Sequence, residues 1–159
     1  MLAWLTESTV GRLLQTFFIS MVPVAELRAG IPYGVSLGLD YHAAAAAAIL
    51  GNLFPVPVII VYVRRVFAWL RRKSAGLDAW ISGMESKAEH KGEKVKKYGA
   101  LGLCLLVAIP LPGTGAWTGA LVAAVLGLRM RDALPAIILG VLIAAAIVLG
   151  LTYGVSYIF

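Results

Sequence analysis

Two ionisable residues, Glu26 and Arg28, lie in a stretch that is otherwise apolar and bounded by prolines. The stretch runs from Pro23 to Pro32, reads Pro-Val-Ala-Glu-Leu-Arg-Ala-Gly-Ile-Pro, and includes Gly30. A carboxylate shielded from water can hold or release a proton near neutral pH, and a guanidinium can bind an anion. Charged groups at membrane depth are costly unless they are paired or face a water-filled cavity, so they are usually functional. We therefore expect these residues to form the centre of a substrate or ion site.

A second stretch, residues 110–117, reads Pro-Leu-Pro-Gly-Thr-Gly-Ala-Trp. Its prolines and glycines prevent a regular helix, and a helix that starts after such a break presents free N–H groups to an anion. The substrate- or ion-binding residues expected here are Pro110, Pro112, Gly113, Thr114, Gly115 and Trp117. The alternatives are that the stretch is only a tight turn and that Trp117 packs in the core.

Asn52 is a further candidate site residue, because an amide within an apolar segment can bond another helix. For Glu26 and Arg28, the alternative to a functional role is a static ion pair, or a carboxylate that only caps the hairpin. The sequence contains no P-loop, nucleophile elbow, dinucleotide fingerprint or HExxH motif, and its two histidines have no companions at metal-ligand spacing. We therefore expect no enzyme activity, no metal and no cofactor.

The composition indicates an integral membrane protein. Of the 159 residues, 60% are hydrophobic and only 14% are charged, which lies outside the range of soluble domains. Residues 64–97 carry ten of the fourteen Lys and Arg and four of the eight Asp and Glu, so this segment accounts for the whole net charge of +6. Such a segment is typical of positive-inside topology and of contact with anionic lipid headgroups rather than nucleic acid. We expect it to be cytoplasmic.

The apolar segments are of two kinds. Residues 41–63 and 133–159 are long enough to cross a bilayer, with a kink expected at the prolines that follow Asn52. Residues 13–39 and 98–128 each contain one of the broken stretches. Irregular backbone at membrane depth is tolerated only where protein or water covers it, so both are expected to be re-entrant hairpins.

Apolar residues within the basic segment recur at helical spacing from Val66 to Met84. This periodicity predicts one amphipathic helix lying on the membrane surface. The alternative is a helix that packs on a neighbouring subunit.

The sequence also contains an internal repeat at an offset of 89 residues. Pro23 aligns with Pro112, Gly30 with Gly119, and Leu-Gly-Leu at residues 37–39 with the same tripeptide at residues 126–128. Such matches can arise by chance, but their shared offset favours duplication. Each half, residues 13–63 and 98–159, would hold one hairpin and one span, so the second half would be inverted. The predicted fold is a single all-α integral membrane domain of two inverted repeats, joined by a basic amphipathic cytoplasmic helix.

The two broken motifs resemble those of the putative small multi-drug export proteins. The resemblance covers the chain from about Leu13 to Phe159. That family is distantly similar to the DedA (SNARE-associated, VTT-domain) superfamily, whose members are bacterial inner-membrane proteins with two re-entrant hairpins. The resemblance implies proton- or ion-coupled transport, with lipid-carrier phosphates as one substrate class and with acidic and arginine residues of the hairpins as functional residues. Glu26 and Arg28 match this pattern, whereas residues 110–117 contain no acid or arginine.

Together these features predict a multi-pass transporter or exporter of a small amphipathic or anionic substrate, such as a drug-like molecule or a lipid phosphate. It would work by alternating access between the hairpins, with Glu26 as the protonatable coupling group and Arg28 as the anion contact. So short a chain can enclose little of a pathway, so a homodimer or larger assembly is expected. The alternatives are a non-transporting scaffold or lipid organiser and, last, an intramembrane enzyme.

Overall fold

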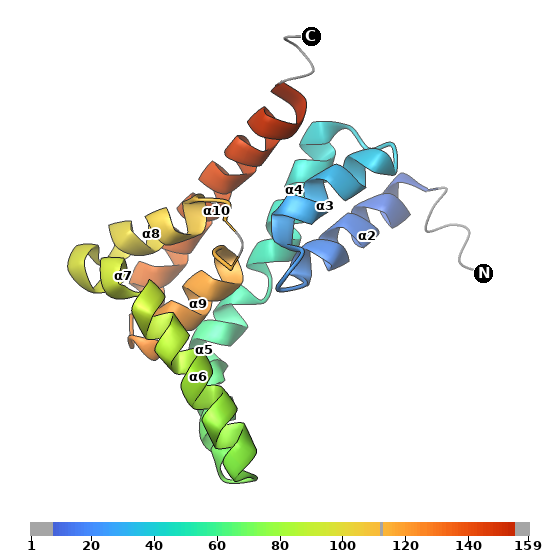
Figure 1. Ribbon diagram of the computed structural model, residues 1–159. Coiled ribbons are helices and arrows are strands. Elements are labelled where there is room, and N and C mark those ends of the chain that lie inside the picture. Colours follow the sequence, from blue (N-terminus) through green and yellow to red (C-terminus); the bar gives the residue numbers. More distant parts are fainter. Residues whose placement is uncertain (1–7, 112, 155–159) are drawn as a thin grey trace.

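The computed structural model describes residues 8–111 and 113–154, and it contains helices but no strand within these residues. Two helical segments, Tyr41–Arg71 and Met130–Gly154, are long and apolar enough to cross a membrane. Figure 1 shows the arrangement. The elements are α2 (Thr9–Met21), α3 (Glu26–Ser36), α4 (Tyr41–Leu53), α5 (Val56–Arg71), α6 (Ala75–Lys91), α7 (Glu93–Tyr98), α8 (Ala100–Ala108), α9 (Ala116–Val125), α10 (Met130–Leu149) and the π-helical turn η1 (Gly150–Gly154).

Each broken stretch of the sequence separates two short helices. The first separates α2 from α3, and the second separates α8 from α9. Helix α2 ends at Met21 because Pro23 cannot continue it. The expectation that Pro32 bounds the break is wrong, since this proline lies inside α3. A proline there costs α3 one backbone hydrogen bond without ending the helix.

The first predicted span is interrupted at Phe54 and Pro55, between α4 and α5, as expected from its prolines. Its helix continues beyond residue 63 as far as Arg71. The second span starts at Met130, slightly before the predicted residue 133. Its predicted last residues, 155–159, lie outside the described part of the chain.

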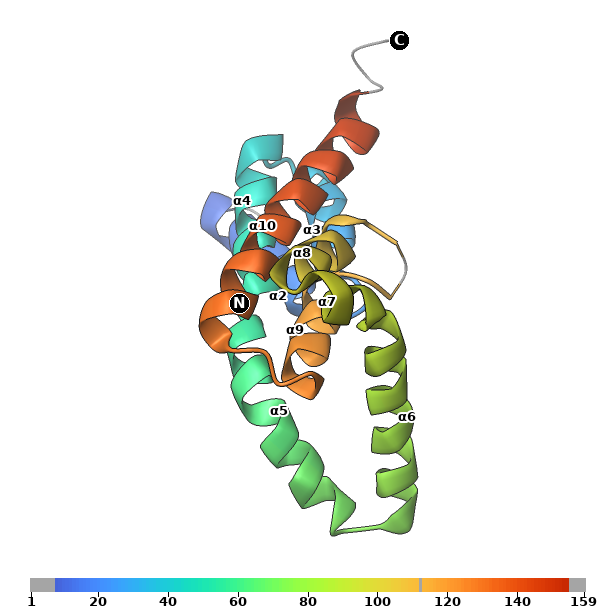
Figure 2. The ribbon, with the colours of Figure 1, turned by 90° about the vertical axis from the view of Figure 1, so that its left-hand side faces the viewer.

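The prediction of one amphipathic helix across the basic segment is wrong. Residues 64–71 complete α5, the chain turns at residues 72–74, and α6 starts anew because the Ser74 hydroxyl accepts a hydrogen bond from the Gly76 N–H. Figure 2 shows α5 and α6 as two helices, joined at one end, that extend away from the other helices; we call this pair the arm. Ile81 and Ala88 of α6 are buried because α6 packs on α5 and α9 of its own chain, whereas Trp80 is exposed.

Local structure recurs at the offset of 89 residues. Helix α3 corresponds to α9, and both end in a turn at a glycine with positive φ, 85° at Gly38 and 67° at Gly127. In both turns the residue after the glycine donates its N–H to the carbonyl five residues earlier. Gly51 and Gly140, also 89 residues apart, are where α4 and α10 approach α2 and α8 so closely that a Cβ would clash.

Helix α10 connects the two halves of the molecule. It packs on α8 and α9 from its own half and on α3, α4 and α5 from the other. Its buried face consists of small and β-branched residues, including Ala136, Gly140 and Ala144, which allow close helix approach. The site described next lies where these helices converge.

Candidate functional site

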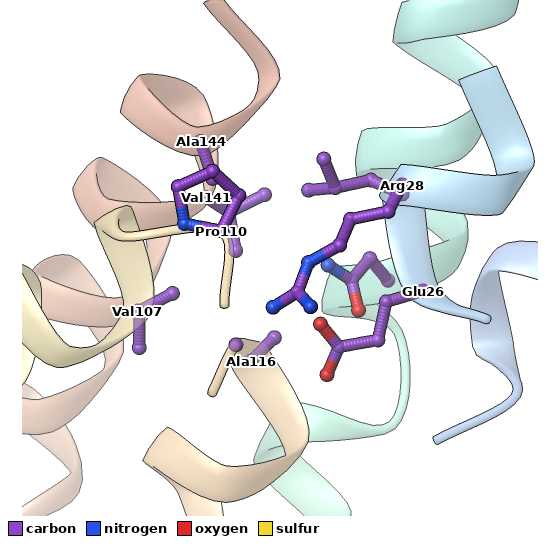
Figure 3. Close-up of a pocket in the computed structure, with 10 residues that line it drawn as sticks. Glu26, Arg28, Val107, Pro110, Ala116, Val141 and Ala144 are labelled. Carbon is purple, nitrogen blue, oxygen red and sulfur yellow. The ribbon is translucent and has the colours of Figure 1, made fainter. Parts of the chain in front are cut away.

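The N-termini of α3 and α9 meet at Glu26 (Figure 3). Glu26 is the first residue of α3, and its φ of 47° is the only positive φ of a non-glycine residue in the described part of the chain. A left-handed backbone at such a residue is strained and persists only where the surrounding structure enforces it. The residue is 5% exposed. Glu26 is therefore held in a costly conformation with its carboxylate inside the protein.

The first hairpin of the structure is the helix pair α2–α3 and the second is α8–α9. The Glu26 carboxylate, from the first hairpin, caps α9 of the second. Its Oε1 accepts a hydrogen bond of 3.4 Å from the backbone N–H of Trp117, in the first turn of α9. A Cβ built on Gly115 would overlap the carboxylate oxygens, so only glycine leaves room for them. The second hairpin thus contributes no acidic residue at this point, and its Gly115 leaves space for the Glu26 carboxylate of the first hairpin.

Arg28 binds the loop of the second hairpin rather than Glu26. Its Nη2 donates to the backbone oxygen of Thr114 at 2.8 Å and to its hydroxyl at 3.3 Å. The ion pairs found among the described residues do not include Glu26 with Arg28. The alternative of a static pair between these residues is therefore not what the structure contains.

Trp117 fixes the two hairpins to each other. Its indole Nε1 donates to the backbone oxygen of Met21, the last residue of α2, at 2.9 Å. The side chain is partly buried. Two hairpins separated by some ninety residues of sequence are thus joined by hydrogen bonds from Trp117 and Arg28.

A small cavity of about 10 Å³ lies beside these contacts. Figure 3 shows the Glu26 and Arg28 side chains extending toward Pro110 and Ala116 across it. Asn52 also lines the cavity, is 1% exposed, and has no hydrogen-bond partner for its amide oxygen or nitrogen. The expectation that Asn52 bonds another helix is therefore wrong.

The structure brings some of the predicted site residues together and leaves others apart. Five of them line the cavity: Glu26, Arg28, Asn52, Pro110 and Gly115. Thr114 accepts a hydrogen bond from Arg28, and the Trp117 N–H donates one to Glu26. The other predicted residues lie elsewhere: Pro23 is exposed in the α2–α3 turn, Gly30 packs against Ser20 and Ala48, Pro32 lies within α3, and the Gly113 carbonyl accepts from Lys91 and Thr118. Pro112 lies outside the described residues.

Sequence reasoning missed Val141 and Ala144 of α10, which line the same cavity. The repeat could have identified one of them. The offset of 89 places Glu26 opposite Gly115 and Asn52 opposite Val141, and all four residues line the cavity. The cavity is thus built from equivalent positions of the two halves, with the polar side chains coming from the first half.

A larger cavity, of about 420 Å³, lies on the other side of Thr114. One wall is polar, from the end of α6 and the start of α7, and its lysines Lys91 and Lys94 outnumber its one acid, Glu93. The opposite wall is apolar, with Leu105, Leu106, Ile109 and Leu111. Thr114 lines this cavity and also accepts the hydrogen bonds of Arg28, which lines the smaller cavity. Among the described residues there is no group of three or more His, Cys, Asp or Glu that could hold a metal ion.

A comparison with protein-family models matches residues 26–147 to the family described as "Putative small multi-drug export protein". The chain belongs to this family. The resemblance predicted from the two motifs is thereby confirmed, and the matched region contains Glu26, Arg28 and the second broken stretch. No curated protein and no solved structure matches the chain in the corresponding searches. The more distant similarity to the DedA superfamily is not tested by this match and stays a hypothesis.

Membership of the family gives the function in general terms. An export family with two apolar helices of spanning length indicates a membrane protein with a general exporter role. It points to a transporter rather than to an enzyme. The family name does not specify the substrate or the coupling.

Proposed function

We propose that this small multi-drug export protein carries a small amphipathic or anionic substrate across the membrane by alternating access, coupled to protonation of Glu26. The observation that carries the proposal is the burial of the Glu26 carboxylate where the two hairpins meet. Its capping of α9 changes if the carboxylate gains a proton, because a protonated carboxyl is a weaker acceptor. Protonation would then weaken one of the bonds that hold the hairpins together.

The proposal treats the two halves as inverted repeats with re-entrant hairpins. It is supported by the recurrence of helices and glycine turns at the offset of 89 residues. With residues 64–97 in the cytoplasm of a bacterial cell, α2–α3 would enter the inner membrane from outside and α8–α9 from inside. Arg129 and Arg131 would then be cytoplasmic as well, as the positive-inside rule favours.

The larger cavity supports the substrate class. A polar wall with an excess of lysines, facing an apolar wall, suits a molecule with an acidic group on an apolar body, and a volume of about 420 Å³ is within the range of small-molecule sites. Thr114 lines this cavity and accepts the hydrogen bonds of Arg28, so such a ligand would lie near the Arg28 contact. We propose that it reaches Arg28 when the hairpins separate. A homodimer or larger assembly would enclose the rest of the pathway, and the exposed lysines of α6 and α7 would contact anionic lipids.

The experiment is transport by the full chain in proteoliposomes, with a fluorescent carboxylate amphipath and the cation ethidium as separate substrates. We expect Glu26→Gln to lower flux at least tenfold without loss of folded protein, while Glu89→Gln, at an exposed position on α6, keeps the wild-type rate. Arg28→Gln should abolish flux of the anion.

Two results would contradict the proposal. Wild-type flux in Glu26→Gln would favour a scaffold or lipid-organising role. Transport of ethidium that survives Arg28→Gln, with no transport of the anion by the wild type, would overturn the substrate class.

A further inference from the structure

Asn52 presents a buried amide that the described protein groups leave unsatisfied. The residue is 1% exposed, and neither its Oδ1 nor its Nδ2 has a hydrogen-bond partner. Buried amides in native proteins are nearly always bonded, because desolvation without a partner is costly. The side chain lines the cavity that also contains Glu26 and Arg28. The cavity is therefore where a partner for Asn52 should be sought.

The size and charge of the cavity restrict what this partner can be. A volume of about 10 Å³ is close to that of a single water-sized sphere. An added cation would face the guanidinium of Arg28, and an added anion would face the carboxylate of Glu26. A neutral group that both donates and accepts can satisfy both ends of the Asn52 amide. Water is the molecule of this size that meets all three conditions.

We propose that one water molecule is bound in this cavity between the Asn52 amide and the Glu26 carboxyl group, and that Asn52 is a positioning residue for proton exchange at Glu26. In the exchange the O–H bond of the protonated carboxyl breaks as its proton bonds to the water oxygen. A carboxylate and a hydronium ion result, and the hydronium returns a different one of its protons to the carboxylate, which restores the protonated carboxyl group and a neutral water. The role of this exchange in transport rests on the proposed function, whereas the water site itself does not.

The chain offers a matched control at the equivalent position of the other half. Val141 lies 89 residues after Asn52 and lines the same cavity, but its side chain has no polar atom. Truncating Val141 changes the packing of the cavity and leaves the proposed water ligands in place. Replacing Asn52 by leucine keeps the approximate size of the side chain and removes the amide.

The test is infrared spectroscopy of the purified full chain in lipid nanodiscs, at a pH low enough for Glu26 to be protonated. Transfer into D₂O reveals the exchange rate of the carboxyl proton, and the band is assigned by its loss in Glu26→Gln. We expect Asn52→Leu to slow the exchange at least tenfold, whereas Val141→Ala, which enlarges the cavity and keeps the amide, should not slow it. A wild-type rate in Asn52→Leu, or equal slowing in both variants, would overturn the proposal.

A second measurement needs no variant. A structure of the wild-type protein in nanodiscs, at a resolution that shows bound water, should contain a water within hydrogen-bond distance of both the Asn52 amide and a Glu26 oxygen. A clear map without it would overturn the inference even if Asn52→Leu fails to fold. Neither measurement requires a substrate, so their failure is distinguishable from failure of the transport assay.

Discussion

At the residue scale, the site depends on Gly115 because this residue leaves space for the buried Glu26 carboxylate. Its φ of 128° and ψ of −167° lie in a region that only glycine adopts readily, and a side chain there would occupy the place of the Glu26 carboxylate. By the offset of 89 residues, Gly115 is the counterpart of Glu26. The two halves therefore share a single carboxylate at their meeting point.

Gly115→Ala should destabilise the protein, because alanine strains this backbone conformation and its Cβ overlaps the Glu26 carboxylate. Backbone strain alone is worth about 1–3 kcal/mol, and displacement of Glu26 adds to it. The expected result is a clearly lower thermal unfolding midpoint in detergent. Gly83→Ala is the control, because Gly83 is exposed on α6 with open space around its Cα and should be neutral or slightly stabilising. An unchanged midpoint for Gly115→Ala would mean that the tight contact with Glu26 is not formed.

Which residues form the site could be predicted in part. Glu26 and Arg28 were identifiable because charge within apolar sequence is costly, and the glycines of the second stretch because they break a helix. The partner of Arg28 was not identifiable, since it is a backbone carbonyl, and every residue type has one. The unpaired state of Asn52 could not be predicted either, because it depends on which faces of several helices meet around it.

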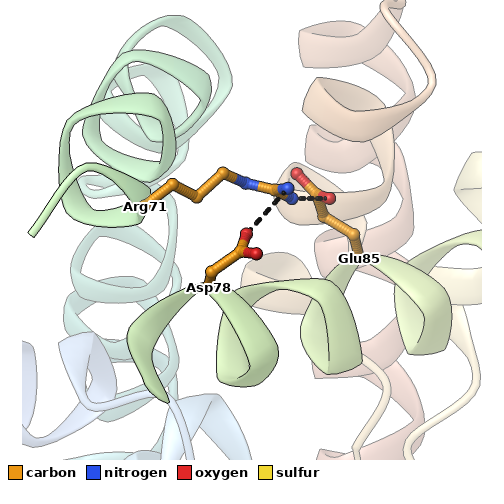
Figure 4. Close-up of polar contacts among 3 residues, drawn as sticks. All are labelled: Arg71, Asp78 and Glu85. Carbon is orange, nitrogen blue, oxygen red and sulfur yellow. Dashed lines mark hydrogen bonds and ion pairs between the residues drawn. The ribbon is translucent and has the colours of Figure 1, made fainter. Parts of the chain in front are cut away.

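At the element scale, the arm of α5 and α6 is joined by one arginine. Figure 4 shows Arg71, at the end of α5, reaching both Asp78 and Glu85 on α6. The acids lie seven residues apart, so both project from one face of α6 toward α5. The sequence predicted one continuous surface helix here, since the helical spacing continues from Leu70 to Leu77 and only Lys73 departs from the apolar pattern. Only the cap at Ser74 and the pairing of Arg71 reveal two antiparallel helices.

Arg71→Gln should loosen this arm. The ion pairs of Arg71 with Asp78 and Glu85 are partly exposed, so each stabilises the folded protein by at most about 1 kcal/mol. Amide exchange in the first half of α6 should become a few-fold faster, and 0.5 M salt should reduce the difference between variant and wild type. Arg72→Gln is the control, because Arg72 is exposed and belongs to none of the ion pairs of the described residues. Equal exchange in both variants would show that the ion pairs do not hold the arm.

At the scale of the whole molecule, the helix pairs α2–α3 and α8–α9 and the two helices of spanning length converge near the buried Glu26 carboxylate. The order of elements was predictable because length, apolar composition and proline positions limit which segments can cross a bilayer. The end of the first helix of spanning length was not, because its apolar sequence ends at Val63 while α5 continues without a break to Arg71.

The topology can be tested with single cysteines at Asp40, His90 and Met130 in a Cys104→Ala background. All three positions lie at or near helix ends in the structure. We expect a membrane-impermeant maleimide to label the first from outside intact cells and the other two only after the membrane is opened. Labelling of position 130 from outside would mean that α8 and α9 together cross the membrane, and the two hairpins could not then enter from opposite sides.

The most direct test of the central claim is modification of Glu26 by dicyclohexylcarbodiimide, an apolar reagent that reacts with protonated carboxyl groups. In proteoliposomes we expect one adduct per chain, located at Glu26 by peptide mass spectrometry, with flux lost in proportion to labelling. Glu26→Gln should remain unlabelled. Full labelling of Glu26 with unchanged flux, or no labelling while transport proceeds, would contradict a role for this carboxyl group in transport.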